Sequence, residues 1–144
     1  MLKPVSIFAY LGMVGGIIGL LATRRLLSPS PQVIIPQAAG VLLMIWARIV
    51  FGRRSFHLGA NPTGGGLVTA GPYWFIRHPI YTGVCLFTGA GVVAHWSWKA
   101  AWLGGLVFVG ALVRLFCEEA MVTHRYPEYR QYAAKTWRMV PFLF

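Results

Sequence analysis

The chain has 144 residues, of which 57% are apolar and only 11% are charged. Soluble domains use about 25% charged residues, so this composition excludes an ordinary water-soluble fold and predicts an integral membrane protein. Its 13 lysines and arginines outnumber three acidic residues, and the resulting net charge of +10 favours anionic lipid over nucleic acid as the partner.

The first apolar run, Pro4 to Thr23, is long enough to span a bilayer core of about 30 Å. It contains two overlapping pairs of glycines four residues apart, which allow another helix to approach closely. These glycines are Gly12, Gly15, Gly16 and Gly19. A cleaved signal peptide is the alternative interpretation, but the apolar stretch is too long and only Lys3 precedes it as a basic residue.

Three further apolar runs follow a Ser-Pro turn at residues 28–31. They are Val33 to Phe51, Pro79 to Trp98 and Ala100 to Cys117. Because only Lys99 separates the last two, they should form a tight helical hairpin. The segment from Glu118 to Phe144 is amphipathic, basic and aromatic, which is typical of an interfacial helix. The expected fold is therefore an all-α membrane bundle of about four transmembrane helices plus an interfacial C-terminal helix, in a single domain over residues 1–144.

The distribution of basic residues predicts the orientation of this bundle. With four spans, both termini and the connection at residues 52–78 share one side of the membrane. That side carries eight lysines and arginines against three on the other, without Arg48 and Arg114, which lie within helix ends. Both termini are therefore expected in the cytoplasm.

Two polar clusters should meet at the cytoplasmic face, because the third and fourth helices run out and back. They are the string Gly71 to Gly83, with Arg77, His78 and Tyr81, and the group Arg114, Glu118 and Glu119. Pro79 suits the first turn of a helix, whose free amides can receive an anion. An ordinary ion pair at the membrane edge would account for Arg114 and Glu118 alone, but intramembrane ionisable groups are usually functional.

Paired motifs extend over residues 64–142. They are Leu67-Val68-Thr69-Ala70-Gly71-Pro72-Tyr73 with Arg77-His78-Pro79-x-Tyr81-x-Gly83, then Glu118-Glu119 with Tyr126-Pro127-Glu128-Tyr129, Tyr132, Arg138 and Pro141. In this pattern the chain resembles the isoprenylcysteine carboxyl methyltransferase family and the related phospholipid N-methyltransferases. The resemblance implies an enzyme that transfers a methyl group from S-adenosylmethionine to a membrane-soluble acceptor at the cytoplasmic face.

The resemblance also implies roles for individual residues. The positions that match cofactor contacts are Gly65, Gly66, Leu67, Val68, Tyr73, His78, Pro79, Ile80, Tyr81 and Glu118. Arg114 matches a residue that faces the acceptor. Glu118 can bind the cofactor's ammonium group by a charge-assisted hydrogen bond, and His78 with the helix start can hold its carboxylate. A carboxylate acceptor needs no general base, whereas an amine or thiol acceptor does, and His78, Tyr81 and Glu119 are then the candidates.

Two other functions remain open. One is an NADPH-dependent membrane reductase of the sterol-reductase type, and the other is a non-enzymatic membrane module whose basic tail binds anionic lipid. The complete string from Arg77 to Gly83 followed by two glutamates favours the methyltransferase over the reductase. The acceptor stays open among a prenylated cysteine carboxylate, a phospholipid amine and a small thiol. No metal site is expected, because Cys85 and Cys117 lie in apolar runs and the four histidines are scattered.

Overall fold

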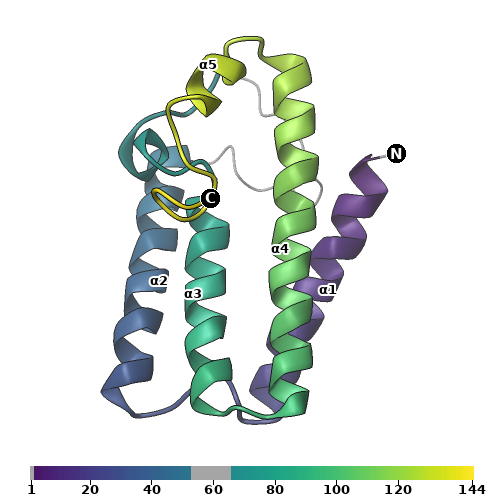
Figure 1. Ribbon diagram of the computed structural model, residues 1–144, viewed down its shortest axis with the longest axis vertical. Coiled ribbons are helices and arrows are strands. Elements are labelled where there is room, and N and C mark those ends of the chain that lie inside the picture. The colour runs from purple at the N-terminus through teal and green to yellow at the C-terminus, as the bar shows by residue number, and fades with distance from the viewer. Residues whose placement is uncertain (1, 53–65) are drawn as a thin grey trace.

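The computed structural model describes residues 2–52 and 66–144, and within these ranges the chain is helical and contains no β-strand (Figure 1). Four long helices form a bundle, and two short elements lie at one end of it. The long helices are α1 (Leu2–Ala22), α2 (Pro31–Phe51), α3 (Pro79–Ala94) and α4 (Trp98–Arg125). The short elements are the 3₁₀ helix η2 (Gly71–Trp74) and the helix α5 (Tyr129–Ala133). The predicted all-α class is confirmed.

Three of the helices, α1, α2 and α4, are long and apolar enough to cross a membrane. Helix α3 is also apolar, but its 16 residues extend about 24 Å, less than a bilayer core of about 30 Å. Large apolar side chains cover the outside of the bundle, where Phe8, Ile49 and Val93 are more than two thirds exposed. The predicted membrane helical bundle is therefore confirmed, with three full-length helices and a shorter fourth one.

The turn between α3 and α4 corrects one predicted boundary. Helix α3 ends at Ala94, whereas the apolar run predicts a helix that continues to Trp98. The reason is Ser97, whose backbone is extended and whose hydroxyl accepts a hydrogen bond from the amide of Ala100. Ser97 therefore caps the start of α4, and a cap fixes a helix boundary even inside an apolar run.

The end of α4 corrects a second boundary. The fall in hydropathy predicts that the helix ends at Cys117, but it runs on to Arg125. Polar residues end a membrane span without ending a helix, because backbone hydrogen bonds continue until Pro127, which lacks a backbone donor. At 28 residues α4 is about 42 Å long and extends beyond the bilayer core. The C-terminal segment accordingly forms no long interfacial helix, since α5 has five residues.

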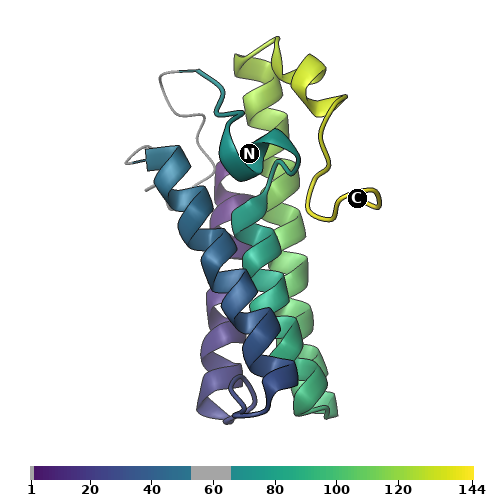
Figure 2. The same ribbon diagram turned by 90° about the vertical axis from the view of Figure 1, so that its left-hand side faces the viewer.

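The bundle consists of two closely packed helix pairs, α1 with α4 and α2 with α3 (Figures 1 and 2). Glycines allow the backbones to approach at both contacts. A Cβ atom added at Gly110 of α4 would lie 2.7 Å from the carbonyl oxygen of Ala9 in α1. One added at Gly40 of α2 would lie 2.7 Å from the carbonyl oxygen of Gly83 in α3. Any side chain at Gly110 or Gly40 would therefore push the paired helices apart.

The close approach predicted for the first helix is confirmed at two of its four glycines. Gly16 packs against the backbone of Leu103 in α4, where an added Cβ atom would lie 2.7 Å from the carbonyl oxygen, and Gly19 packs against the Leu103 side chain. Gly12 and Gly15 instead border open space, since an added Cβ atom would have no neighbour within 4 Å. One of the glycines in each predicted pair therefore serves the contact with α4.

Candidate active site

The start of α3 and the last turns of α4 lie at the same end of the bundle, as their antiparallel course predicts (Figure 1). The C-terminal tail, residues 134–144, returns to this end and pairs with the segment that precedes α3. The amide of Arg77 donates to the carbonyl of Trp137 (2.7 Å), and the amide of His78 donates to that of Arg138 (2.9 Å). Three segments that are distant in sequence thus frame one polar site.

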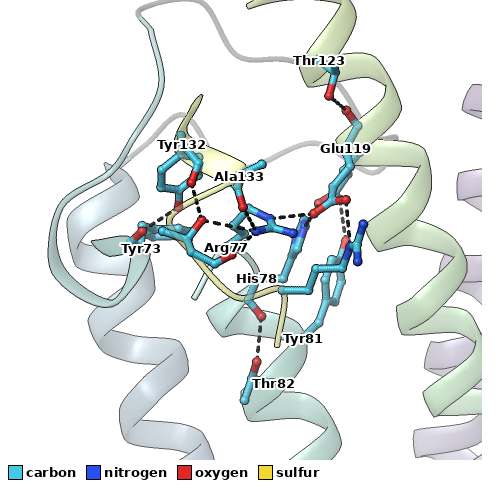
Figure 3. Close-up of polar contacts among 12 residues, drawn as sticks. Tyr73, Arg77, His78, Tyr81, Thr82, Glu119, Thr123, Tyr132 and Ala133 are labelled. Atoms are coloured by element: carbon cyan, nitrogen blue, oxygen red, sulfur yellow. Dashed lines mark hydrogen bonds and ion pairs between the residues drawn. The ribbon is translucent and has the colours of Figure 1, made fainter. Parts of the chain in front are cut away.

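Glu119 is the carboxylate at which these three segments meet (Figure 3). Its Oε1 accepts a hydrogen bond from Arg77 Nε at 2.8 Å, and its Oε2 accepts one from Arg138 Nε at 3.0 Å. His78 Nε2 lies 3.4 Å from Oε1. The side chain of Glu119 is 13% exposed, so its charge is compensated by cationic groups rather than by water. Glu119 therefore fastens α4 to the segment before α3 and to the tail.

Arg77 extends this fastening to the C-terminal residues. Its guanidinium donates to the carbonyl of Ala133 at 2.9 Å, and to both the carbonyl and the hydroxyl oxygen of Thr136. The planar guanidinium suits such a role, because its donors point in fixed directions and can reach several acceptors at once. Arg77 is thus a structural cation with a carboxylate on one side and the tail on the other.

Glu118 has different surroundings, although it is the next residue in the chain. Its Oε1 accepts a short hydrogen bond of 2.5 Å from the hydroxyl of Tyr81 and lies 3.4 Å from Arg114 NH2. Arg114 Nε in turn donates to the Tyr81 hydroxyl at 2.8 Å. Oε2 of Glu118 lies 3.8 Å from His78 Nδ1, which is too far for a hydrogen bond. The Glu118 side chain is 27% exposed, twice the value for Glu119.

Tyr73 and Tyr132 join the 3₁₀ helix to α5. The hydroxyl of Tyr132 donates to the carbonyl of Tyr73 at 2.6 Å (Figure 3). Burial raises the pKa of Tyr132 to about 12, so the phenol keeps its proton and remains a donor across the physiological range. The Tyr73 ring is buried and packs against Phe51 of α2, with ring centroids 5.5 Å apart. Tyr73 therefore connects α2, η2 and α5.

The other described cofactor positions lie at the start of α3 and in the segment before η2. Pro79 is fully buried in the first turn of α3, and Ile80 follows it half-buried. Leu67 and Val68 are half-buried in the segment that leads to η2. Gly66 precedes them with a φ of +87°, which favours glycine. Gly65 lies outside the described residues.

Four residues of this site received no role from the sequence. They are Ser6, Tyr10, Thr136 and Arg138. The backbone carbonyl of Ser6 accepts a hydrogen bond from Arg114 NH1 at 3.4 Å, and the Tyr10 ring lies against the same guanidinium. A polar residue and a tyrosine four positions apart in an apolar run are a signal for this contact, since they share one helix face. The contacts of Thr136 and Arg138 depend on long-range pairing of the tail, which the sequence does not reveal.

The described structure is a helical membrane bundle with carboxylates, guanidinium groups and phenols at one end. The profile of the family described as phospholipid methyltransferase matches residues 34–129, which is two thirds of the chain. The match includes most of α2 and all of α3 and α4, and it leaves out α1 and the tail. The molecule is thus of the membrane methyltransferase class, and the chain belongs to the phospholipid methyltransferase family. Neither a curated protein nor a solved structure matches it.

Proposed function

We propose that the protein transfers a methyl group from S-adenosylmethionine to a membrane-soluble acceptor, at the cytoplasmic face where α3 begins. One observation carries this proposal. Glu118 is a partly exposed carboxylate that stands in the motif region of a methyltransferase family and is oriented by a phenol and a buried guanidinium. His78 lies 3.8 Å from Glu118, and Arg77 and Arg138 bind the neighbouring Glu119, so the described part of the site contains charges of both signs.

The residues present fit this cofactor. S-adenosylmethionine would supply an activated methyl group, an ammonium, a carboxylate and an adenosine. Glu118 Oε2 can receive an ammonium, since its contact with His78 Nδ1, at 3.8 Å, is beyond hydrogen-bond distance. His78 and the first turn of α3 suit the carboxylate, because a helix start presents free amides. Leu67 and Val68, which are half-buried, offer apolar contacts for the adenosine.

Arg114 suits the acceptor side of the reaction. Helix α4 runs toward the end of the bundle that carries the polar site, called the site end below. Arg114 therefore lies one turn deeper in the membrane than Glu118. An acceptor that enters laterally from the bilayer would reach Arg114 before the water-facing part of the site. We assign Arg114 to orientation of the acceptor and Tyr81 to the link between Arg114 and Glu118. Alignment of this kind supplies much of the acceleration in a displacement at an activated carbon.

The acceptor class decides whether a general base is needed. The family's description directs attention first to a phospholipid amine, which must lose a proton before it attacks. Of the three candidates, Glu119 has both oxygens bonded to guanidinium groups and suits positioning rather than proton transfer. Tyr81 uses its hydroxyl proton in the hydrogen bond that it donates to Glu118. His78, which lies between the two glutamates, is therefore our first choice for the base.

The level of the site in the membrane supports lateral entry of a lipid. Around the site end, Trp74, Phe142 and Leu143 are at least three quarters exposed, which is typical of side chains at a membrane interface. The excess of basic residues on this side supports a cytoplasmic location for it. The cofactor would then arrive from water and the acceptor from the bilayer. Reporter fusions at residue 144 test this orientation, and an exported reporter would contradict it.

The test of the proposed function uses purified protein in phosphatidylethanolamine vesicles with labelled S-adenosylmethionine. We expect label in the lipid fraction from the wild-type chain and strongly reduced label from Glu118→Gln. Glu128→Gln is the matched control, because Glu128 is the third acidic residue and is exposed at the start of α5. Vesicles that contain prenylated cysteine or small thiols test the other acceptors.

A parallel titration separates the two other functions from this one. Binding of NADPH in place of S-adenosylmethionine would favour a reductase. Binding of neither, together with retention on anionic vesicles, would favour a lipid-binding module. Either result would overturn the proposed methyl transfer.

A further inference from the structure

Arg114 is held from α1, the helix that lies outside the region matched by the family profile. Its Cζ atom lies 4.9 Å from the centroid of the Tyr10 ring, and its NH1 donates to the carbonyl of Ser6 at 3.4 Å. Arg114 is 5% exposed and Ser6 is fully buried. A guanidinium removed from water requires compensating partners, and an aromatic face within about 6 Å attracts it electrostatically. Helix α1 therefore contributes directly to the stability of this buried cation.

The axial position of α1 along α4 is fixed by a close backbone contact one helical turn from Arg114. Gly110 lies four residues before Arg114 on α4, and an added Cβ there would lie 2.7 Å from Ala9 O and 3.0 Å from Met13 Cβ. Ala9 directly precedes Tyr10, so this contact sets the register that brings the Tyr10 ring to Arg114. Sliding of α1 along α4 would break both contacts together.

The contact of Tyr10 with Arg114 continues into the site. Arg114 Nε donates to the Tyr81 hydroxyl, and the Tyr81 hydroxyl donates to Glu118 Oε1. A rotated Arg114 could not keep the 2.8 Å hydrogen bond to Tyr81, because guanidinium donors lie in fixed directions. The orientation of Glu118 would then lose one of its two supports.

We infer that Tyr10 is a positioning residue, whose ring holds Arg114 in the orientation that serves Tyr81, Glu118 and the methyl acceptor. This inference rests on the proposed function, since orientation of the acceptor is the role assigned to Arg114. It makes α1 part of the active site rather than only a membrane anchor. The electron-rich face of the ring is the feature required, and the hydroxyl is not.

The first arm of the test measures the contact without reference to catalysis. Tyr10 is replaced by phenylalanine and then by mono-, di- and trifluorinated phenylalanines, which keep the shape of the ring but weaken its electrostatic attraction for cations. Thermal stability is measured for each variant in the wild-type chain and in an Arg114→Met background. We expect stability to fall stepwise with fluorination only where Arg114 is present. Equal slopes in the two backgrounds would overturn the inference, whether or not the protein methylates anything.

The second arm measures turnover in the folded variants. Tyr10→Phe should retain wild-type kcat, whereas trifluorination and Tyr10→Leu should each lower kcat with the acceptor about tenfold. The KM for the cofactor should change much less than kcat, because Glu118 keeps its hydrogen bond from Tyr81. Phe8→Leu is the matched control on the lipid-facing side of α1, where Phe8 is 73% exposed, and it should leave kcat unchanged.

The two arms separate this inference from the proposed function. Flat kcat across the fluorinated series, or a Tyr10→Phe variant as impaired as Tyr10→Leu, would overturn the positioning role. A wild-type chain that transfers no methyl group would instead overturn the proposed function, and with it the positioning role, while the stability arm would still decide the contact. If Tyr10→Leu does not fold, the fluorinated series alone decides, because it preserves packing.

Discussion

Two adjacent glutamates on α4 have opposite surroundings. Both carboxylate oxygens of Glu119 accept hydrogen bonds from the guanidinium groups of Arg77 and Arg138, and little of the side chain is exposed. Glu118 is more open, because a neutral phenol supplies a short hydrogen bond to its Oε1 and its Oε2 lies 3.8 Å from His78, beyond hydrogen-bond distance. The same residue type therefore stands in two different electrostatic environments one position apart.

The difference follows from helix geometry. Successive residues of an α-helix point about 100° apart, so Glu118 and Glu119 face different neighbours. Glu119 faces the tail and the segment before α3, and it fastens them. Glu118 faces Tyr81 and Arg114, and in our proposal part of its charge serves a ligand. A carboxylate whose charge is compensated by cations can hold protein segments together. One that is hydrogen-bonded by a neutral donor can still bind a cation from outside.

The largest expected effect is on stability, from Glu119→Gln. This change leaves the buried Arg77 without its anionic partner, and removal of one member of a buried ion pair costs about 3 kcal/mol or more. We expect a clearly lower unfolding temperature in detergent than for Glu118→Gln or the exposed control Glu128→Gln. Equal melting of the Glu118 and Glu119 variants would remove the distinction between the two glutamates.

A smaller effect is expected from Arg114→Gln, which sharpens the comparison on the Glu118 side. Loss of a charged hydrogen-bonding group costs about 1.5–3 kcal/mol, so kcat/KM for the acceptor should fall roughly tenfold to a hundredfold. The affinity for the cofactor should fall less. The competing interpretation, a plain ion pair between Arg114 and Glu118, predicts equal destabilisation by either single change and no further loss in the double mutant. Stability and cofactor affinity of the three variants distinguish the two interpretations.

The smallest effect concerns the attachment of α5 to η2. Tyr132→Phe removes the phenol that donates to the carbonyl of Tyr73, and one such hydrogen bond contributes about 1 kcal/mol. We expect a small decrease in unfolding temperature and a cofactor affinity within about threefold of wild type. A loss as large as that of Glu119→Gln would mean that α5, rather than Glu119, holds the site end together.

Much of the topology and the meeting of the two motifs could be predicted from the sequence. Apolar runs give the helices, and an antiparallel pair must bring His78 near Glu118. The helix ends were less predictable, because Ser97 and Pro127 act through backbone geometry and not through hydropathy. The boundary predicted at Cys117 marks the end of the apolar run. The helix itself continues for as long as its backbone hydrogen bonds do.

The contact of Arg77 with Glu119 rather than Glu118 could not be predicted. Both stand in the same motif, and which one meets Arg77 depends on how α4 is rotated against the start of α3. Arg138 reaches Glu119 only because the tail pairs with the segment before α3, across some 60 residues of sequence. The role of Tyr10 required the register set at Gly110, which is a matter of backbone contact between two helices.

The affinity of purified Glu118→Gln for S-adenosylmethionine tests the central claim most directly. The change keeps the shape of the side chain and removes its charge, so our account predicts that the Kd rises roughly tenfold to a hundredfold while the unfolding temperature falls less than in Glu119→Gln. Glu128→Gln, measured alongside, should bind like the wild-type chain. Wild-type affinity in the Glu118→Gln variant would contradict the assignment of Glu118 to the cofactor.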